Sequence, residues 1–285
     1  MEVVDLRFKG VEHLIGREAL ARLAGASVCV VGLGGVGSWV VEALARSGVG
    51  GLTLVDMDEV CVTNINRQIQ ALSSTVGSPK ADALAARVHE IHPTCSVRIV
   101  RRFFARSTAD EILSHGHDLV VDGIDRIENK TLLIAECVRR QIRLITTGSA
   151  GDRTSPFGVQ LVDLSRTVHD SLLQMVRKQL RTQYGFPRGE RTKFLIPCIY
   201  SPKQRNAPRG ACSAASVRSS CNDGLGSATF VTGAFGFCVA AEAVRILTEE
   251  RTALPYPWFA KRAEALLDAP EREPQRAHEN CAQSG

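Results

Sequence analysis

A glycine-rich turn near the amino terminus is the first part of the sequence that could do chemistry. Residues 32–37 read Gly-Leu-Gly-Gly-Val-Gly, between an apolar segment and a segment with helical spacing. Backbone N–H groups at such a turn point toward an anion at the positive end of the following helix. Gly32, Gly34 and Gly37 have the spacing of a dinucleotide-binding fingerprint, and Gly35 lies within the same turn. The turn therefore predicts a site for the phosphates of a nucleotide.

An acidic residue follows the turn at the distance expected of a ribose ligand. Asp56 lies 24 residues after Gly32 and directly after an apolar segment at 52–55. Its carboxylate is placed to accept a hydrogen bond from a ribose hydroxyl. Asp58, two residues further on, is a second candidate for contact with the nucleotide. These features alone favour NAD or FAD on frequency, and a glycine turn that serves only packing is the alternative.

Two cations and a further carboxylate change the choice of nucleotide. Arg67 offers a planar fork and Lys80 a point charge, and both could reach a triphosphate, on which charge grows during phosphoryl chemistry. Asp125, just past an apolar strand that ends at Asp122, could hold Mg²⁺ through its carboxylate. Each residue alone is more often a solvated side chain or a helix cap. Their combined order predicts an ATP-cleaving enzyme, because an NAD-linked oxidoreductase would leave Arg67 and Lys80 without a role.

The elements that must position these residues alternate along the chain. Apolar runs predict strands at 27–31, 52–55, 95–100, 118–121 and 143–147, and helical spacing predicts helices at 38–47, 79–91, 107–115 and 127–140. This alternation predicts an α/β fold with a doubly wound, mostly parallel Rossmann-like sheet, which binds ligands at the carboxyl ends of its strands. A change of pattern then predicts an extra carboxyl-terminal α/β part, with a strand at 157–164, a helix at 170–183 and a strand at 193–200.

Composition separates the remainder of the chain into a loop, a helix and a tail. Residues 201–226 are rich in Ser, Gly, Pro and Asn, which predicts a long mobile loop. Residues 228–249 form a strongly apolar helix whose uncharged run is 14 residues long. That length is short for a membrane span and normal for a core helix, so we expect burial rather than membrane contact. The charged tail at 253–285 is expected to be partly disordered.

The motifs that contain these residues resemble those of a known superfamily. The adenylating domains of ubiquitin-activating enzymes, and their bacterial relatives in thiamine and molybdopterin synthesis, have motifs similar to GLGGVG, DMDEVCVTNINRQ, VGSPK and VDGID in this chain. This resemblance covers about residues 7–150. The segments TTGSAG at 146–151 and GLGSATFVTGAFGF at 224–237 resemble the branch that dehydrates threonylcarbamoyladenosine in tRNA, which extends the similarity to about residue 249.

The resemblance implies a role for each candidate residue. The glycine turn would approach the ATP phosphates, and Asp56 would take the ribose. Asn64, Arg67 and Lys80 would contact phosphates, and Asp125 would serve Mg²⁺. The resemblance therefore implies ATP and Mg²⁺ as cofactors and assigns catalysis to Arg67, Lys80 and Asp125.

One residue of the family pattern is missing here. Relatives often carry an amino-terminal arginine that reaches the phosphates, commonly across a dimer. This chain has His13 at the aligned position, and Arg7 is a candidate substitute. The resemblance also implies a homodimer. With this resemblance, we expect an ATP-binding adenylation domain at 1–155 and a substrate-binding part at 156–252.

Members of this superfamily adenylate two classes of substrate. The tRNA branch is an ATP-dependent ligase or cyclase that activates the carboxylate of threonylcarbamoyladenosine next to the anticodon. Other relatives adenylate the carboxyl end of a ubiquitin-like sulfur carrier, and many hold zinc with two Cys-x-x-Cys pairs. None of the nine cysteines here forms such a pair. A third reading is a non-catalytic nucleotide-binding adaptor in sulfur transfer, with a cysteine desulfurase or a sulfur-acceptor protein as partner.

The charge distribution favours an RNA partner. The chain has a net charge of +5, but residues 177–218 hold ten basic residues and one acidic residue. Lys203, Arg205 and Arg209 are the candidates for contact with tRNA phosphates, in a salt-dependent way. A solvated and flexible basic loop is the alternative.

The cysteines and the amino terminus indicate the compartment. Nine scattered cysteines, an odd number, suit reduced thiols, and the first ten residues lack the apolar region of a signal peptide. We therefore expect a cytoplasmic protein. Cys198, just before the predicted loop, and Cys221, near its end, are the candidates for an acyl-accepting thiol. Most free cysteines are small buried hydrophobes, so we expect cyclisation without either thiol.

Overall fold

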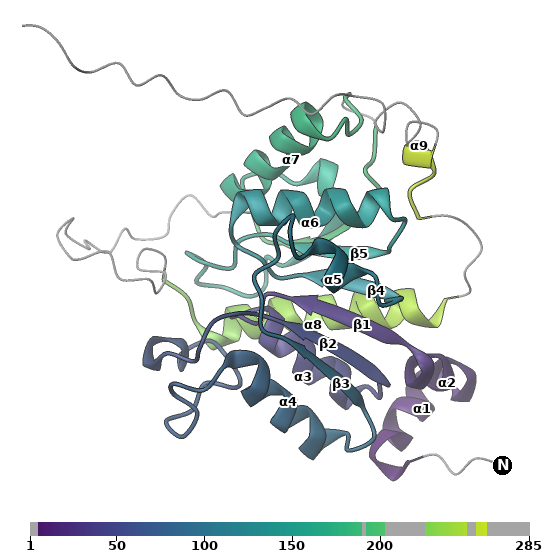
Figure 1. Cartoon of the computed structure of the whole chain (residues 1–285), viewed down its shortest axis with the longest axis vertical. Helices are drawn as coiled ribbons and strands as arrows, with labels where there is room; N and C mark the ends of the chain where they lie inside the picture. The colour runs from purple at the N-terminus through teal and green to yellow at the C-terminus, as the bar shows by residue number, and fades with distance from the viewer. Residues whose placement is uncertain (1–4, 190–191, 203–225, 250–254, 261–285) are drawn as a thin grey trace, which may run out of the picture.

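The structure is a computed structural model that describes residues 5–189, 192–202, 226–249 and 255–260. Its centre is a seven-stranded sheet in the order β3-β2-β1-β4-β5-β7-β6 (Figure 1). The strands are β1 (Ser27–Val31), β2 (Gly51–Val55), β3 (Ser96–Val100), β4 (Leu119–Asp122), β5 (Leu144–Thr147), β6 (Gln160–Asp163) and β7 (Pro197–Tyr200). All neighbours are parallel except β6 and β7. The predicted doubly wound, mostly parallel α/β fold is confirmed.

Helices cover both faces of the sheet (Figure 1). One face packs against α2 (Arg17–Gly25), α3 (Gly37–Arg46), α4 (Lys80–Ile91) and α8 (Thr229–Thr248), and the other against α5 (Ala109–Leu113), α6 (Ile127–Arg139) and α7 (Ser171–Gln183). Alternate residues of β1 serve the two cores, since Val28 and Val30 belong to one and Cys29 and Val31 to the other. A strand that is buried on both faces is apolar throughout, which is why the sequence shows it so clearly.

The long apolar helix α8 packs within the molecule. It lies along α3, and a Cβ built on Gly236 would come within 2.5 Å of the Cβ of Trp39. Glycine at this position therefore lets the two helices approach closely. By length and composition α8 could also cross a membrane, but 61% of its most apolar window is buried inside the protein. The apolar side chains of α8 are used mainly for packing.

The carboxyl-terminal part joins the same sheet. β7 pairs with β5, and β6 pairs with β7 at the edge, so the predicted boundary at residue 155 falls inside one continuous sheet. Beyond it, residues 255–260 include α9 (Pro257–Ala260) and pack on the core: Tyr256 and Phe259 are buried, and the Trp258 indole Nε1 donates to the Phe194 carbonyl at 3.1 Å. This start of the predicted tail is therefore ordered against the protein, and the rest of it lies outside the described residues.

Short elements at the amino terminus have no counterpart in the sequence-based prediction. They are η1 (Leu6–Phe8), α1 (Lys9–Ile15) and α2, and further short turns are η2 (Val62–Asn64) and η3 (Leu164–Arg166). α1 buries none of its residues, so its sequence has no apolar stripe to reveal it. α2 buries Ala19, Leu20 and Leu23 and leads directly into β1, so both helices lie where β1 begins (Figure 1).

Candidate active site

The glycine turn lies between β1 and α3, where the strand order reverses between β1 and β4. Gly32 has a φ of +88°, and a Cβ there would come within 2.8 Å of the Gly123 carbonyl oxygen. A Cβ on Gly37 would lie 1.9 Å from the carbonyl oxygen of Gly32. These two glycines close the turn tightly against the chain after β4. A Cβ on Gly34 would meet no described atom within 4 Å, so this side of the turn is open to a ligand.

Asp56 holds the turn from the end of β2. Its Oδ2 accepts a hydrogen bond from the Leu33 N–H at 2.7 Å, and its Oδ1 accepts one from the Asp58 N–H at 2.8 Å. Burial raises the pKa of Asp56 above its usual value, and the nearby charge of Lys80 offsets only part of this rise. A carboxylate has about four lone-pair sites, so Asp56 can hold the turn and still accept a ribose hydroxyl.

Lys80 is the first residue of α4 and is buried. Its Nζ donates to Asp58 Oδ2 at 2.9 Å, and its backbone N–H donates to the Asp58 carbonyl at 3.0 Å. A cation at the positive end of a helix is unfavourable for the helix itself. The acidic partner offsets this cost, and it fixes the ammonium at the carboxyl edge of the sheet.

Arg67 lies beside the glycine turn. Its backbone carbonyl accepts from Trp39 Nε1 and from Thr232 Oγ1, each at 3.0 Å, which attaches it to α3 and α8. Its Cδ is 3.6 Å from the position of a Cβ on Gly35. The guanidinium donates from Nη1 to the Thr63 carbonyl at 2.7 Å and is only partly buried. Arg67 thus lies in the middle of the segment between β2 and α4, and Lys80 directly follows that segment.

Asn64 is used partly by the fold. It is buried, and its Oδ1 accepts from the Cys61 N–H at 3.0 Å to close a capping box around η2. The amide oxygen of Asn64 thus stabilises the segment that carries Arg67. Contact of Asn64 with a phosphate stays a prediction.

Asp125 lies on the exposed turn between β4 and α6, at the same edge as the glycine turn. A carboxylate exposed beside a phosphate site has the donor chemistry that Mg²⁺ prefers. Behind this turn, Lys130 and Asp122 form a buried ion pair that the sequence did not reveal. A lysine in an amphipathic helix pattern indicates a solvated side chain, so no sequence signal singled it out.

A second residue that sequence reasoning missed is Gln70. Its Nε2 donates to the Leu33 carbonyl at 3.0 Å, so Asp56 and Gln70 hold the two sides of residue 33. Gln70 is buried, and its Oε1 has no hydrogen-bond partner among the described residues. The sequence signal that could have revealed Gln70 is the alternation Gln-Ile-Gln at 68–70. A glutamine that such an alternation buries normally has a specific hydrogen-bond partner.

The amino-terminal candidates lie away from the glycine turn of their own chain. His13 is exposed on α1, and Arg7 pairs with Asp5 at 2.9 Å. Both lie at the end of the sheet where β1 begins, whereas the glycine turn follows the end of β1 (Figure 1). Neither side chain can therefore serve the site of the same chain.

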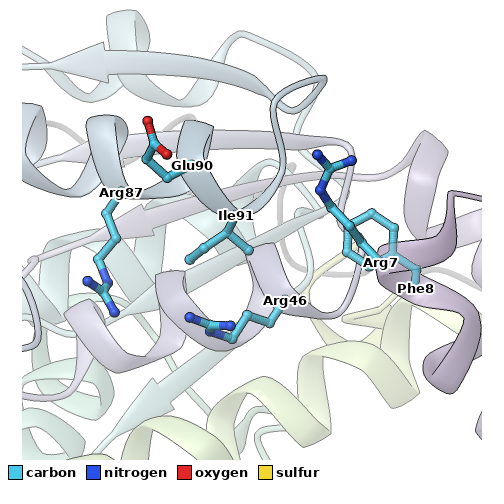
Figure 2. A pocket seen from close by; sticks show the side chains of 6 residues that line it. All are labelled: Arg7, Phe8, Arg46, Arg87, Glu90 and Ile91. Atoms are coloured by element: carbon cyan, nitrogen blue, oxygen red, sulfur yellow. The ribbon is translucent and has the colours of Figure 1, made fainter.

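The same region contains a cavity of about 500 Å³ lined by Arg7, Phe8, Arg46, Arg87, Glu90 and Ile91 (Figure 2). Two of its arginines share one buried carboxylate: Arg46 and Arg87 donate to Glu42 at 2.7 Å and 2.5 Å. The cavity is remote from the glycine turn, and these two charges are already paired. It therefore contributes nothing to the nucleotide site of its own chain.

The cysteine and loop candidates divide between buried and undescribed residues. Cys198 is fully buried in β7, and burial raises the pKa of its thiol far above the usual range, so a reactive thiolate is disfavoured. Cys221 and the RNA-binding candidates Lys203, Arg205 and Arg209 lie outside the described residues. Both flanks of that segment attach to one turn: Arg153 donates to the Ser201 carbonyl at 2.8 Å, and the Asp152 N–H donates to the Gly226 carbonyl at 2.8 Å.

The fold and the site together define an α/β nucleotide-binding protein with a glycine turn at the topological switch point and cations beside it. The chain belongs to the ThiF family, whose model matches residues 11–283. It is 44% identical over 250 residues to a tRNA threonylcarbamoyladenosine dehydratase of Haemophilus influenzae, which covers 87% of this chain and 95% of the relative.

Solved structures of the Escherichia coli tRNA threonylcarbamoyladenosine dehydratase have the same fold. Its complex with AMP matches with a TM-score of 0.77 at 39% identity, over 87% of this chain and 98% of that chain. Its complex with ATP matches with a TM-score of 0.76 at 38% identity, over 92% and 99%. The predicted resemblance to the adenylating superfamily, and to its tRNA branch, is confirmed.

Proposed function

We propose that this protein is an ATP-dependent tRNA threonylcarbamoyladenosine dehydratase, which cyclises the modified nucleoside next to the anticodon through an adenylated carboxylate. The observation that supports this most is the carboxyl edge of the sheet, where an open glycine turn, the Lys80–Asp58 pair and Arg67 lie together. The Escherichia coli relative of that name, which this chain matches over nearly its whole length, has been solved in complex with AMP and with ATP. A hydride-transfer enzyme would not need these cations.

The chemistry has two steps. A carboxylate oxygen of the substrate attacks the α-phosphorus of ATP. Pyrophosphate leaves with the electron pair of the phosphorus–oxygen bond that breaks. A nitrogen of the ureido group in the same nucleoside then attacks the activated carbonyl carbon, loses its proton, and displaces AMP. The second step is intramolecular, so positioning replaces an enzyme nucleophile, in agreement with the buried thiol of Cys198.

The residues of the site would divide this work. Backbone amides of the glycine turn would hold the phosphates, and Asp56 would orient the ribose. Arg67 and Lys80 would stabilise the negative charge that develops on the departing pyrophosphate. Asp125 would hold Mg²⁺, which when bound neutralises part of the phosphate charge.

We propose a homodimer in the cytoplasm. Its support is the distance of Arg7 and His13 from their own glycine turn, since a contribution of the amino-terminal segment then requires a second copy of the chain. The packing of α8 within the protein supports a role without membrane contact. Docking of a cysteine desulfurase or a sulfur-acceptor protein stays a prediction from the family resemblance.

Mass spectrometry of tRNA nucleosides tests the proposed function. Cells that lack the protein should keep threonylcarbamoyladenosine and lose its cyclic form, and the wild-type gene should restore it. Lys80→Ala and Asp125→Ala should not restore it, because each removes a charge at the triphosphate. Arg139→Ala, in the last turn of α6, is the matched control and should restore it fully. Full cyclisation by Lys80→Ala and Asp125→Ala would remove the catalytic assignment, and adenylation that depends on a carrier protein instead of tRNA would favour the sulfur-carrier reading.

A further inference from the structure

The segment after β3 crosses the carboxyl edge of the sheet and reaches the start of α6. Asn129 Nδ2 on α6 donates to the Phe104 carbonyl at 2.6 Å. The guanidinium carbon of Arg126 lies over the ring of Phe103, 5.8 Å from its centroid. Arg126 directly follows Asp125, so this arginine–aromatic pair lies beside the candidate metal carboxylate.

The two adjacent phenylalanines of this segment have opposite environments. Phe104 is only 3% exposed and belongs to a hydrophobic core, whereas Phe103 is 53% exposed. Phe104 therefore anchors the segment, and its packing does not require the ring of Phe103. The ring of Phe103 therefore lies under the Arg126 guanidinium and is still exposed enough for an unpaired base to stack on it.

The position of Arg126 is not explained by the stability of its helix. Arg126 is the N-cap residue of α6, and its side chain forms no capping hydrogen bond. Short polar residues are preferred there, and a positive charge at this end of a helix is opposed by the helix dipole. A cation in this position fits a negatively charged ligand at the carboxyl edge.

Two exposed arginines lie on either side of the two phenylalanines in the sequence. Arg102 and Arg106 are exposed, and within the described part of the chain neither forms an ion pair. Arg101 differs, since it makes two hydrogen bonds to the Asp82 carboxylate, at 2.8 Å and 2.5 Å. The surface of Arg102, Phe103, Arg106 and Arg126, called the Phe103 surface below, thus combines unpaired charge with an exposed ring.

We propose that the Phe103 surface binds a single-stranded RNA loop, with a base stacked on Phe103 and phosphates on Arg102 and Arg106. This rests on the proposed function, which makes tRNA the substrate. Proteins recognise unpaired bases by stacking them on aromatic rings and guanidinium planes. The reacting nucleoside lies next to the anticodon, so its unpaired neighbours in the loop pass close to the edge where the carboxylate is adenylated. None of its residues belongs to the basic segment at 201–226.

Binding of an anticodon stem-loop RNA that contains threonylcarbamoyladenosine tests the proposal. Affinity is measured by fluorescence anisotropy with the full chain, over a series of KCl concentrations. Phe103→Leu keeps an apolar side chain but removes the ring, and should weaken binding about tenfold without changing the salt dependence. Phe103→Trp should bind at least as tightly as the wild type.

The charged residues have a different expected signature. The double variant Arg102→Gln and Arg106→Gln should reduce the slope of log affinity against log salt by about 1.4, because each phosphate contact on a single strand contributes about 0.7. Arg139→Gln, whose guanidinium is paired with Glu136 at the far end of α6, is the control and should leave the slope unchanged. ATP affinity, measured by calorimetry, should stay the same in every variant.

The outcomes separate this inference from the proposed function. A wild-type protein that cyclises the nucleoside while Phe103→Leu binds RNA with unchanged affinity would overturn the Phe103 surface alone. A loss of ATP affinity in Phe103→Leu would also overturn it, because the ring would then support the fold of the site. A wild-type protein that neither binds the RNA nor cyclises it would remove both.

Discussion

Lys130 and Asp122 form an ion pair with 2.9 Å between Nζ and Oδ2, and both side chains are fully buried. The ammonium also donates to the Ile124 carbonyl at 3.0 Å, and Asp122 Oδ2 accepts from Thr146 Oγ1 at 2.7 Å. The pair therefore connects α6 with β4 and β5 directly behind the turn that presents Asp125. Two charges are stable at this depth only because each is paired and hydrogen-bonded.

Replacing the lysine should strongly destabilise the protein. Lys130→Met leaves the Asp122 carboxylate buried without its counter-ion, which costs about 3–5 kcal/mol. Urea unfolding followed by circular dichroism measures the loss. The double variant Lys130→Met and Asp122→Asn also removes the unpaired buried charge, so it should recover part of the lost free energy of unfolding. A loss below about 1 kcal/mol for the single variant would show that water or another group compensates the charge.

Two glycines of the turn should respond differently to the same substitution. Gly34→Ala adds a methyl group where no described atom lies within 4 Å, so the midpoint of thermal unfolding should hardly change, but ATP should lose its close approach to the backbone. Gly37→Ala adds one 1.9 Å from the Gly32 carbonyl oxygen, so the fold itself should be destabilised. Thermal unfolding with and without ATP separates the two. An ATP-dependent stabilisation of Gly34→Ala equal to that of the wild type would contradict a phosphate site at this turn.

As the pH falls, nucleotide binding should begin to weaken at a higher pH than it would if Asp56 had the usual pKa of an aspartate. Burial raises the pKa of Asp56, so in the folded chain its carboxylate takes up a proton at a higher pH than when unfolded. A ribose hydroxyl needs the carboxylate as acceptor, so affinity falls as the pH decreases through the raised pKa. Folding stability changes in the opposite sense: the contribution of Asp56 is complete below its unfolded pKa and is lost as the pH rises through its folded pKa.

Calorimetric titration with AMP at a series of pH values measures this dependence. The phosphate of the nucleotide titrates as well, so Asp56→Asn is titrated in parallel, and the difference between the two curves belongs to Asp56. Parallel curves for both proteins would show that this carboxylate does not bind the ribose.

Cyclisation should not depend on the thiol of Cys198. The side chain is fully buried, and its raised pKa keeps it protonated at neutral pH. Cys198→Ala removes one buried sulfur and should retain most of the turnover, at a cost in stability of about 1 kcal/mol. Turnover is measured from the cyclic nucleoside formed in vitro. An inactive but folded variant would require an acyl-thioester step and would change the mechanism.

The sequence by itself determined the fold and the place of the glycine turn within it. Strands buried on both faces must be apolar throughout, and a glycine turn between such a strand and a helix needs residues without Cβ atoms at fixed spacing. These are local requirements, so the sequence alone reveals the alternation of elements, the glycines of 32–37 and Asp56. Helix α1 was missed because it buries none of its residues.

Only the tertiary structure decided which polar side chains serve the fold and which are exposed at the carboxyl edge of the sheet. Lys130 and Arg126 belong to the same short stretch of sequence, yet one is buried against Asp122 and the other lies exposed over Phe103. The difference comes from how α6 packs on the sheet and from the path of the chain after β3. Burial and charge pairing depend on neighbours that are distant in sequence, so they appear only when the elements are assembled.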